Sequence, residues 1–484
     1  MVQREGLVDK LVVKADGSGQ VSHAGSALLA GVADRVGLTR ALSGAMAPTR
    51  QRRSAHDPGV VLRDLAVMLA DGGDCLADLG ALRDQLDLYG NVASDSTAFR
   101  VIDSIDEACL DRLRGAVAVA RARAWSLGAR PQRRRKQEQE QEQEQEQEQE
   151  QEQEQEQEQE QEQARERERG ELTVIDVDAT LTTAHSAKEQ AAGNFKGGFG
   201  HHPLLCYLDE TGEALAGILR PGNAGSNTAA DHKQLLDLAL AQLDQQALEG
   251  EILLRADGAG ATHELTVYCR EAQLRFSVGF DLTEPVREAI IAIPETAWRN
   301  AIRVDGSERK HSQVCELTDH VDLLSAWPQS SRLIARRTKL REGDQQSFAD
   351  HDGYRLAVFL TDQQGDDIPQ LDLTHRGHAR VEDHIRQGKD CGLRNLPFGS
   401  FAQNQVWLWL VMAAQDLIAW TAQLCLADAA RAWELKRLRY RLLHQSGRLA
   451  RHARQTILRL ARDWPWSSQL ADAFTKLQAL APPA

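Results

Sequence analysis

Residues 173–181 read TVIDVDATL, a β-rich run that carries two carboxylates among its apolar side chains. Residues 251–258, EILLRADG, form a second apolar run, in which Asp257 precedes three small residues. Asp176 and Asp178 are two residues apart, so on a strand they lie on the same face. A carboxylate in a buried strand is costly unless it is paired or bound to a cation. These two strands therefore predict a site where carboxylates converge.

The segments around these strands follow a recognisable order. Further strands are predicted at HPLLCYLD (202–209), ALAGILRPG (214–222) and LRFSVGFDL (274–282), and an amphipathic helix at 231–246. Three strands, a helix, a strand and then another strand is the order of a ribonuclease-H-like sheet. We therefore predict an α/β fold with a ribonuclease-H-like core.

A third acidic position, Glu382, lies in HARVEDHIRQGKD (378–390), which is predicted to be helical. Lys389 follows Glu382 by seven residues, about two helical turns, and His378 and His375 precede it by four and seven. One helical stripe would therefore carry a carboxylate between cationic or hydrogen-bonding groups.

The acidic positions suit a shared metal ion. Mg²⁺ takes hard oxygen ligands, and two such ions can bind the attacking and leaving oxygens of a phosphodiester displacement. Asp257, Glu382 and either Asp176 or Asp178 are the candidate ligands. The alternative is that Asp176 caps a sheet edge and that Glu382 belongs to an ordinary charged helix face.

Residues 1–125 are predicted to be helical. HDPGVVLRDLAVMLADGGD (56–74) has a helical apolar period that ends at two glycines, a second helix is predicted at 75–82, and Ser94 begins an N-cap sequence. Short helices joined by glycine-containing turns are compatible with a helix-turn-helix DNA reader and equally with a plain helical bundle. Nearby basic residues could hold phosphates or form a solvated loop; they are Arg50, Arg52 and Arg53.

Residues 126–171 are predicted to be a disordered or partly helical linker. Residues 137–163 alternate strictly between Gln and Glu, and a segment without apolar side chains cannot join a packed core. The tract holds 13 of the 71 acidic residues, so the rest of the chain has 58 acidic against 57 basic residues. The net charge of −14 therefore does not exclude a nucleic-acid partner.

Residues 295–362 are predicted to be a β-rich insertion. They lie between Asp257 and Glu382, and a gap of this length led us to expect a module of its own. Trp298 and Trp327 could stack on an unpaired base or pack in a small core. Basic residues accompany them: Arg332, Arg336, Arg337, Lys339 and Arg341.

The remaining segments complete the predicted organisation. The ribonuclease-H-like domain spans 172–294 and 363–428 and includes an apolar helix at 405–426. Residues 429–484 form a basic C-terminal region, in which the stretch 431–462 holds ten Lys or Arg against one Glu. That stretch is either a solvated cationic face or a contact for the DNA backbone.

Cysteine usage and hydropathy bear on localisation. The seven cysteines include no C-x-x-C pair, which indicates buried thiols in a reducing cytoplasm. The sequence led us to expect no apolar run of membrane-spanning length and no secretion signal.

Several longer strings resemble the thirteen-eighty family of bacterial insertion-sequence transposases, which belong to the DDE class. They are VIDVDATLTTAHSAKEQAAGNFKGGFGHHPL, RPGNAGSNTAADH, LLRADGAGATHE, HRGHARVEDHIRQGKDCGLRNLPFGSFAQNQVWL, HDPGVVLRDLAVMLADGGD and RLARHARQTILRLARDWPW. The resemblance covers nearly the whole chain except the Gln-Glu tract. It implies a DDE triad, a β-rich insertion before the glutamate helix, and cut-and-paste movement of an element with terminal inverted repeats.

The resemblance also assigns residues. The D-A-T match makes Asp178 the first metal ligand, with Asp176 as the alternate, and R-A-D-G and R-V-E-D give Asp257 and Glu382. Lys389 keeps the family spacing as a further catalytic residue. His375 and His378 stand where related transposases often have Tyr and Arg, so Arg376 or Arg380 could hold the phosphate instead. The expected DNA contacts are His378, Arg376, Arg380, Arg386, Trp298, Arg336 and Arg337.

The partners expected from the resemblance are two Mg²⁺ ions, with Mn²⁺ as a substitute, and DNA as terminal inverted repeats and target. Self-association in the active DNA complex and a cytoplasmic, nucleoid-associated location are expected, with neither a membrane nor a small-molecule substrate. Two alternatives stay open: a structure-specific nuclease on the same core, and an inactive DNA-binding remnant of a transposase.

Overall fold

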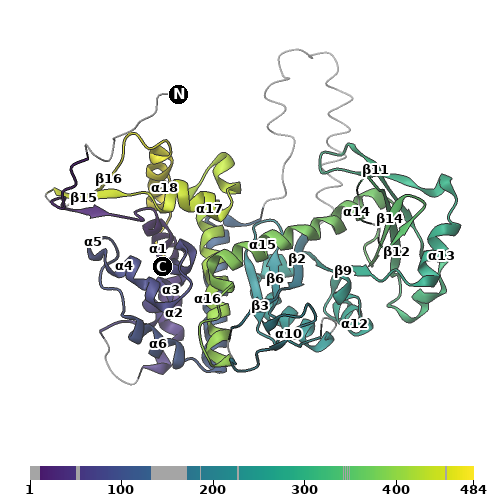
Figure 1. Ribbon diagram of the computed structural model, residues 1–484, viewed down its shortest axis with the longest axis horizontal. Coiled ribbons are helices and arrows are strands. Elements are labelled where there is room, and N and C mark those ends of the chain that lie inside the picture. The colour runs from purple at the N-terminus through teal and green to yellow at the C-terminus, as the bar shows by residue number, and fades with distance from the viewer. Residues whose placement is uncertain are drawn as a thin grey trace, which may run out of the picture.

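A computed structural model describes residues 11–50, 55–131, 172–185, 187–225, 228–341, 343, 345, 347, 349–452 and 455–483. The Gln-Glu tract, Arg52 and Arg53 therefore lie outside the described residues. The molecule is elongated: short helices form one end, a large sheet the middle and the other end, and the helix α16 (Phe401–Cys425) lies between them (Figure 1).

The N-terminal segment is helical, as its apolar period predicted. Its helices are α1 (Ser26–Arg35), α2 (Leu38–Ala45), α3 (Pro58–Asp71), α4 (Gly80–Arg83), α5 (Leu86–Tyr89), α6 (Asp95–Asp103) and α7 (Glu107–Ala124). Asp57 caps α3 by accepting from the amides of Gly59 and Val60, and Gly72, at φ 119°, ends it. The helix predicted at 75–82 is instead the 3-10 turn Leu76–Leu79 followed by the four-residue α4.

The helices α3 and α16 form the centre of the hydrophobic core. Eleven of the 14 residues of α3 are buried, so this helix cannot enter a DNA groove. One continuous cluster of buried apolar residues extends from Leu28 to Leu477, so the N-terminal helices have no separate core. The terminal segments close this end with β1 (Gln20–Val21), α17 (Leu435–Leu438), β15 (Gly447–His452), β16 (Gln455–Leu460) and α18 (Ser467–Ala479).

The length of α16 corrects one expectation from the sequence. Within the described residues, this one helix is long and apolar enough to cross a membrane, but 89% of its most apolar window is buried in the protein. It packs against α3 on the N-terminal side and against the sheet strand β7 (Ala214–Ile218) on the other. Its apolarity is therefore explained by its position between two layers.

A mixed sheet of ten described strands forms the rest of the molecule. Besides β7, the strands are β2 (Leu172–Ala179), β6 (Leu204–Leu208), β8 (Glu251–Ala256), β9 (Leu274–Phe280), β10 (Arg299–Ile302), β11 (Glu308–Glu316), β12 (Arg332–Lys339), β13 (Asp350–His351) and β14 (Tyr354–Thr361). The order is β10-β11-β12-β14-β9-β8-β2-β6-β7, with β13 beside β14. The pairs β2–β8 and β8–β9 are parallel and the others antiparallel. A smaller sheet holds β3 (Thr182–Thr183), β4 (Ala192–Gly193) and β5 (Phe199–His201).

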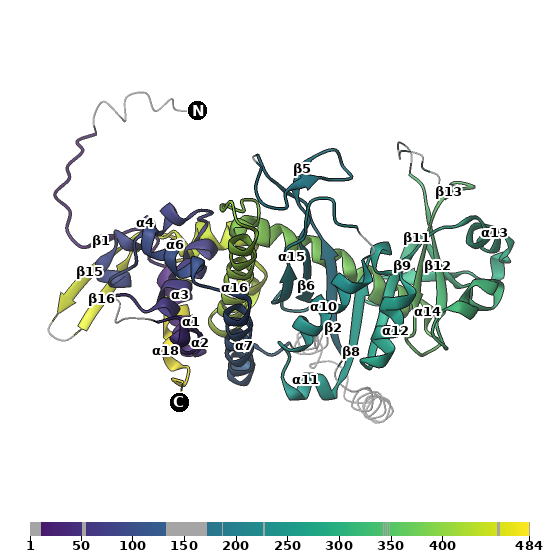
Figure 2. The same ribbon diagram turned by 90° about the horizontal axis from the view of Figure 1, so that it is seen from below.

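Helices lie on both sides of the large sheet. They are α10 (Ala229–Leu240), α11 (Gln245–Glu249), α12 (His263–Glu271), α13 (Glu284–Ala292), α14 (Ile368–Arg376) and α15 (Arg380–Gly388). The helices α10 and α12 lie on one side, and α15 crosses the other (Figures 1 and 2). The single helix predicted at 231–246 is two, because Asp244 caps a new helix by accepting from the amide of Ala247.

The β-rich insertion is not the separate module that its length suggested. Its strand β14 pairs antiparallel with β9, Val358 opposite Phe280, so the insertion extends the central sheet. Pairing β9 in this way removes a free sheet edge. The insertion still has a small core of its own, formed by Ala301, Val314, Ile334, Phe359, Ile368 and Leu371.

A buried polar network joins α7 to the sheet and to α16. The Arg121 guanidinium donates to Glu213 Oε1 at 3.1 Å, to Asp416 Oδ2 at 2.6 Å and to Gln242 Oε1 at 2.8 Å. Burial raises the pKa of Asp416 to about 7, although the charge of Arg121 opposes this. Breaking a buried pair of this kind costs about 3–5 kcal/mol, so the network holds the helical end and the sheet together.

Candidate active site

Two of the predicted ligands lie side by side at the ends of parallel strands. Val177 of β2 pairs with Ala256 of β8, and Asp178 and Asp257 are the next residue on each strand. Asp257 begins a turn, where its Oδ1 accepts from the amide of Ala259 at 3.0 Å. The carboxyl ends of these strands therefore bring the two aspartates to one edge of the sheet.

The helix α15 brings Glu382 to the same place. This helix packs against β2 and β6, and Glu382 lies in its first turn. Burial and the negative charges of Asp257 and Glu382 together raise the pKa of Asp178 to about 6, although the Ala179 amide and His378 oppose this. The charges of Asp257 and Glu382 therefore act on Asp178, as expected from the packing of α15 against β2 and the pairing of β2 with β8.

These three carboxylates differ from their acidic neighbours. Among the described residues, none of Asp178, Asp257 and Glu382 has a Lys, Arg or His nitrogen within 4.0 Å of its oxygens. By contrast, Asp176 and Asp209 beside them are both paired with arginine. Carboxylates without a cationic partner at a strand end supply the hard oxygen donors that a divalent cation requires.

Lys389 also approaches this edge of the sheet. It follows α15 at the start of a wide helical turn, Lys389–Leu393. Burial lowers the pKa of Lys389, as do the charges of Arg394 and Lys196, while the charge of Asp178 opposes this. Asp178, Asp257, Glu382 and Lys389 thus lie on neighbouring elements, β2, the turn after β8, α15 and the turn after α15, and their joint catalytic role stays a prediction.

Asp176, the alternate first ligand, is committed to other partners. Its side chain is fully buried, and its oxygens accept from Arg255 Nε at 2.9 Å, Arg255 Nη2 at 2.7 Å and His378 Nδ1 at 2.9 Å. Arg255 also contacts Asp209 at 2.8 Å, and Arg380 donates to Asp209 Oδ1 at 2.6 Å. This buried ion cluster joins β2, β8 and the loop after β6 to the helix that carries Glu382.

The ion cluster requires a glycine in the helix above it. A Cβ on Gly377 would lie 2.1 Å from Arg255 Nη1. Gly377 begins the 3-10 turn Gly377–Ala379, which separates α14 from α15, so the predicted stripe does not run along one regular α-helix. Sequence reasoning missed Arg255 and Asp209, although an arginine inside the apolar run ILLRA is a signal of a buried pair.

His375 faces the sheet rather than solvent. Its ring stacks on Phe359 with centroids 4.2 Å apart, and its Nδ1 is 2.9 Å from Ser277 Oγ. Burial lowers the pKa of His375 to about 3, with a further contribution from Arg336. A neutral, stacked imidazole at this position packs α14 onto the sheet.

Most of the predicted DNA-binding arginines are paired within the protein. Arg336 and Arg376 both contact Asp372, at 3.0 and 2.7 Å. Arg386, about half exposed, contacts Asp383 at 2.9 Å and Glu434 at 3.2 Å. Arg50 pairs with Asp57, the cap of α3. Any DNA phosphate would have to compete with these carboxylates or share the arginines with them.

The two tryptophans of the insertion have different surroundings. Trp298 is 8% exposed, and the Arg337 guanidinium covers its ring at 4.3 Å while also contacting Glu295. Trp327 is partly exposed, and its ring stacks on the ring of His263 with centroids 4.0 Å apart. His263 is the first residue of α12, the helix that follows the turn after Asp257. Trp298 therefore packs as a core residue, whereas Trp327 packs against His263 and Phe280.

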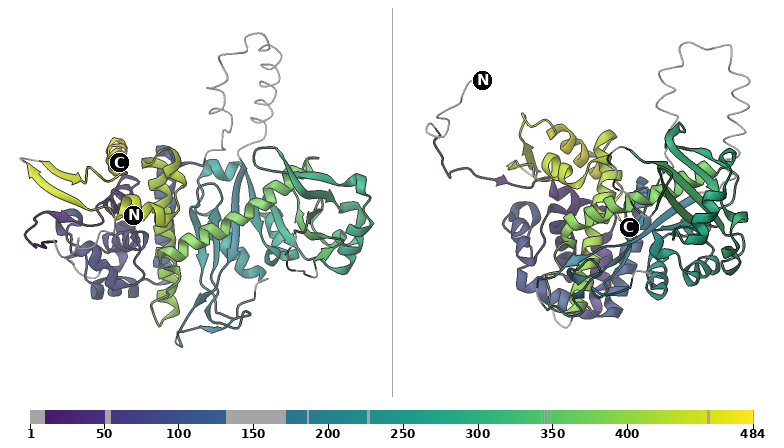
Figure 3. Two further views of the ribbon diagram at one scale, coloured as in Figure 1. Left: turned by 45° about the horizontal axis from the view of Figure 1, so that its top comes forward. Right: turned by 45° about the vertical axis from the view of Figure 1, so that its right-hand side comes forward.

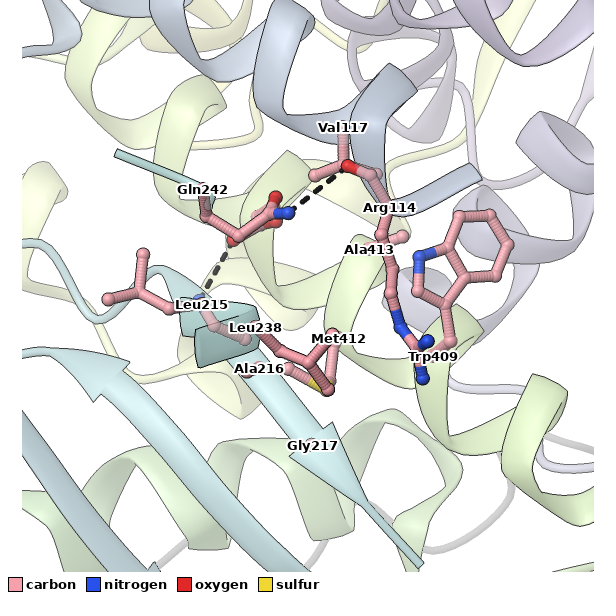
Figure 4. A pocket seen from close by; sticks show the side chains of 12 residues that line it. Arg114, Val117, Leu215, Ala216, Gly217, Leu238, Gln242, Trp409, Met412 and Ala413 are labelled. Atoms are coloured by element: carbon pink, nitrogen blue, oxygen red, sulfur yellow. Dashed lines mark hydrogen bonds between the residues drawn. The ribbon is translucent and has the colours of Figure 1, made fainter. Parts of the chain in front are cut away.

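The cavities lie elsewhere. One of about 20 Å³, room for about one water molecule, lies between α7, β7, α10 and α16, beside Gln242 and Asp416 (Figure 4). An open cleft of about 420 Å³ is lined by Arg303, Val304, Asp305, Arg309 and Arg376. Neither is lined by Asp178, Asp257 or Glu382, of which Asp257 and Glu382 are exposed and Asp178 is half-buried.

A second polar cluster, which sequence reasoning missed, joins three distant segments. The buried carboxylate of Asp71 lies 2.5 Å from His23 Nδ1 and 3.2 Å from His444 Nε2, and Ser26 donates to it. The two imidazole rings stack with centroids 4.2 Å apart. This histidine clasp connects the N-terminal segment, α3 and the C-terminal region.

The sequence and the fold were compared with known proteins. The family model described as transposase DDE domain group 1 matches residues 4–482. No curated protein matches the sequence. Among solved structures, the chain is similar to the piggyBac transposase in a synaptic complex with hairpin DNA, with a TM-score of 0.39 and 11% identity. The alignment covers 86% of this chain and 80% of that one.

Proposed function

The chain belongs to the transposases with a DDE domain of group 1, and on that premise we propose that it cuts and rejoins DNA at Asp178, Asp257 and Glu382. The observation that carries this proposal is that three carboxylates at one edge of the sheet have no cationic partner among the described residues, whereas the neighbouring Asp176 and Asp209 are paired with arginine. The strand order β7-β6-β2-β8-β9 supports a ribonuclease-H-like core.

The donor set fits two Mg²⁺ ions, with Mn²⁺ as a substitute, held by Asp178, Asp257 and Glu382. When bound, such ions would activate the attacking oxygen and stabilise the leaving oxygen of a phosphodiester. The protein's own part is positioning: two parallel strands fix the aspartates, and the ion cluster around Arg255 fixes the helix of Glu382. Lys389 supplies a positive charge for a phosphate at the same edge.

The substrate we propose is the DNA of a mobile element. The motifs shared with the thirteen-eighty family suggest terminal inverted repeats, a target DNA, cut-and-paste movement of a bacterial insertion sequence and self-association on DNA, in the cytoplasm. In this proposal the N-terminal helices bind the repeats. Because α3 is buried, the more exposed α4 to α6 are the candidates for that contact.

The test uses the full-length chain and a labelled duplex that carries an element end. Asp178→Asn, Asp257→Asn and Glu382→Gln should each lower strand cleavage in Mg²⁺ by on the order of 10²-fold or more, with DNA binding retained. Asp383→Asn is the matched control, since Asp383 lies next to Glu382 but pairs with Arg386 at 2.9 Å. It should cleave like the wild type.

Two outcomes would contradict the assignment. Near wild-type cleavage by any of the three variants would remove that residue from the site, and an inactive Asp176→Asn beside an active Asp178→Asn would make Asp176 the first ligand. Products of joining to a second duplex separate a transposase from a structure-specific nuclease, which would only cut.

A further inference from the structure

The strands β15 and β16 form an antiparallel ribbon that projects from the helical end of the molecule (Figures 1 and 2). At its base β1 pairs with β15 through Gln20 and Val21, and the Leu449 amide donates to the Gly19 carbonyl at 2.7 Å. Beyond that base, no other described strand pairs with the ribbon. Apart from Gly447, the residues of the ribbon are therefore exposed or half-buried.

One face of the ribbon carries two arginines at directly opposed positions. Arg448 of β15 is in register with Arg459 of β16, so their side chains lie on the same face. Both are exposed, and within the described parts of the chain neither has a carboxylate partner within 4.0 Å. Like charges directly opposite each other destabilise a strand pair, so the isolated protein gains nothing from this arrangement.

The opposite face of the ribbon has a neutralised arginine. Arg451 is three residues from Arg448, which places it on the other face, and its Nη2 lies 2.5 Å from Asp87 of α5. The unpaired positive charge is therefore confined to the face that points away from α5. The ribbon thus has an inner face bound to the protein and an outer face with free guanidinium groups.

The chemistry of the outer face matches a phosphate backbone. A guanidinium donates two parallel hydrogen bonds to phosphate oxygens, and a phosphate between two arginines relieves their mutual repulsion. The major groove of B-DNA is about 12 Å wide and admits a two-stranded ribbon. Small or apolar side chains, Ala450 opposite Ile457, continue the same face toward the tip.

We propose that the outer face of the β15–β16 ribbon binds the phosphates of duplex DNA through Arg448 and Arg459. This inference rests on the proposed function, because it assigns a contact for the same DNA substrate. The ribbon lies at the end of the molecule away from the insertion, and α16 stands between it and the sheet (Figure 1). It therefore contributes to DNA affinity and not to the chemistry at the carboxylates.

The experiment measures binding of a labelled duplex by fluorescence anisotropy over a series of salt concentrations, in EDTA so that no strand is cut. Arg448→Gln and Arg459→Gln together should weaken binding by at least about fivefold and reduce the salt slope of log affinity by about 2. Arg451→Gln, which removes an arginine from the inner face, should leave the slope within about 0.5 of wild type.

Folding of the variants is followed by thermal melting. Removing both opposed charges should leave the melting temperature unchanged or raise it, so a loss of affinity cannot be ascribed to unfolding. Wild-type affinity and slope in the double variant would overturn the inference, as would equal losses in Arg451→Gln. Because the assay measures binding and needs no cleavage, it tests the ribbon contact even if the catalytic proposal fails.

Discussion

Asp176 and Asp178 lie two residues apart on β2, and their carboxylates have opposite surroundings. Asp176 is fully buried against Arg255 and His378, whereas burial and two neighbouring negative charges raise the pKa of Asp178 to about 6. Without metal, Asp176→Asn should lower the free energy of unfolding by about 3–5 kcal/mol, because it removes the negative charge that pairs with the buried Arg255. Asp178→Asn should raise the melting temperature, because it removes a carboxylate that is destabilised when charged.

Urea and thermal unfolding of both variants in EDTA at pH 7 check this pair. The isosteric substitutions share one strand, so each variant is the other's control. If the two changed stability in the same direction, the contrast between a structural and a ligand aspartate would be wrong.

At this scale the sequence located the acidic residues better than their partners. The two apolar runs indicated Asp257 and either Asp176 or Asp178, and the family resemblance selected Asp178. In the structure, the parallel pairing of β2 with β8 brings Asp178 and Asp257 to the same edge of the sheet. Arg255, Asp209 and the histidine clasp could not be placed, because a pair such as Arg255–Asp209 joins segments whose proximity depends on the finished sheet. The sequence predicts DNA contacts for Trp298 and Arg337, whereas in the structure the Arg337 guanidinium lies over the Trp298 ring.

Elements defined by local signals were predicted closely. The helix α3 begins after the cap Asp57, at Pro58, and ends at Gly72. The Ser94 side chain caps α6 by accepting from the Thr97 amide. The errors arose where tertiary contacts override local pattern. The 3-10 turn at Gly377 accommodates Arg255, and the pairing of β14 with β9 joins the insertion to the sheet. The helices α14 and α15 consequently form a nearly continuous rod from the insertion to the core (Figure 3).

The histidine clasp predicts a pH dependence for the packing of α3 against the terminal segments. Burial would raise the pKa of Asp71, but hydrogen bonds from His23, His444 and Ser26 hold it well below its usual range. The hydrogen bond to Asp71 raises the pKa of His444, against burial and Arg439. A histidine whose pKa is raised on folding contributes fully to the stability of the folded state at a pH below its unfolded-state pKa, about 6.5. This contribution is lost as the pH rises through the folded-state pKa.

A carboxyl group whose pKa is lowered on folding contributes above its unfolded value, about 3.9, and loses that contribution as the pH falls. The clasp should therefore stabilise most between about pH 4 and 6.5. Melting temperatures of the wild type should fall from pH 6 to pH 8.5 relative to those of Asp71→Asn. If the melting temperatures of the two proteins changed with pH in parallel, titration of the histidine clasp would not contribute to stability.

Across the whole molecule, charge is distributed unevenly. The Gln-Glu tract carries 13 of the 71 acidic residues, and it lies outside the described residues, between Pro131 and Leu172. Deleting residues 137–163 should tighten non-specific DNA binding at low salt, because a linked polyanion competes with phosphates for basic surfaces. Replacing its 13 Glu by Gln keeps the length and should give the same gain. A gain in the deletion alone would point to length rather than charge.

The position of α16 has a consequence for synthesis of the protein on the ribosome. The end of α3 at Asp71 and the start of α16 at Phe401 are 330 residues apart, yet the two helices pack together. At translation rates of about 5–20 residues per second, the N-terminal helices emerge roughly 15–70 s before the helix that covers them. During that interval the apolar face of α3 lacks its partner helix, and a nascent chain that already carries Asp178 and Asp257 has no complete site.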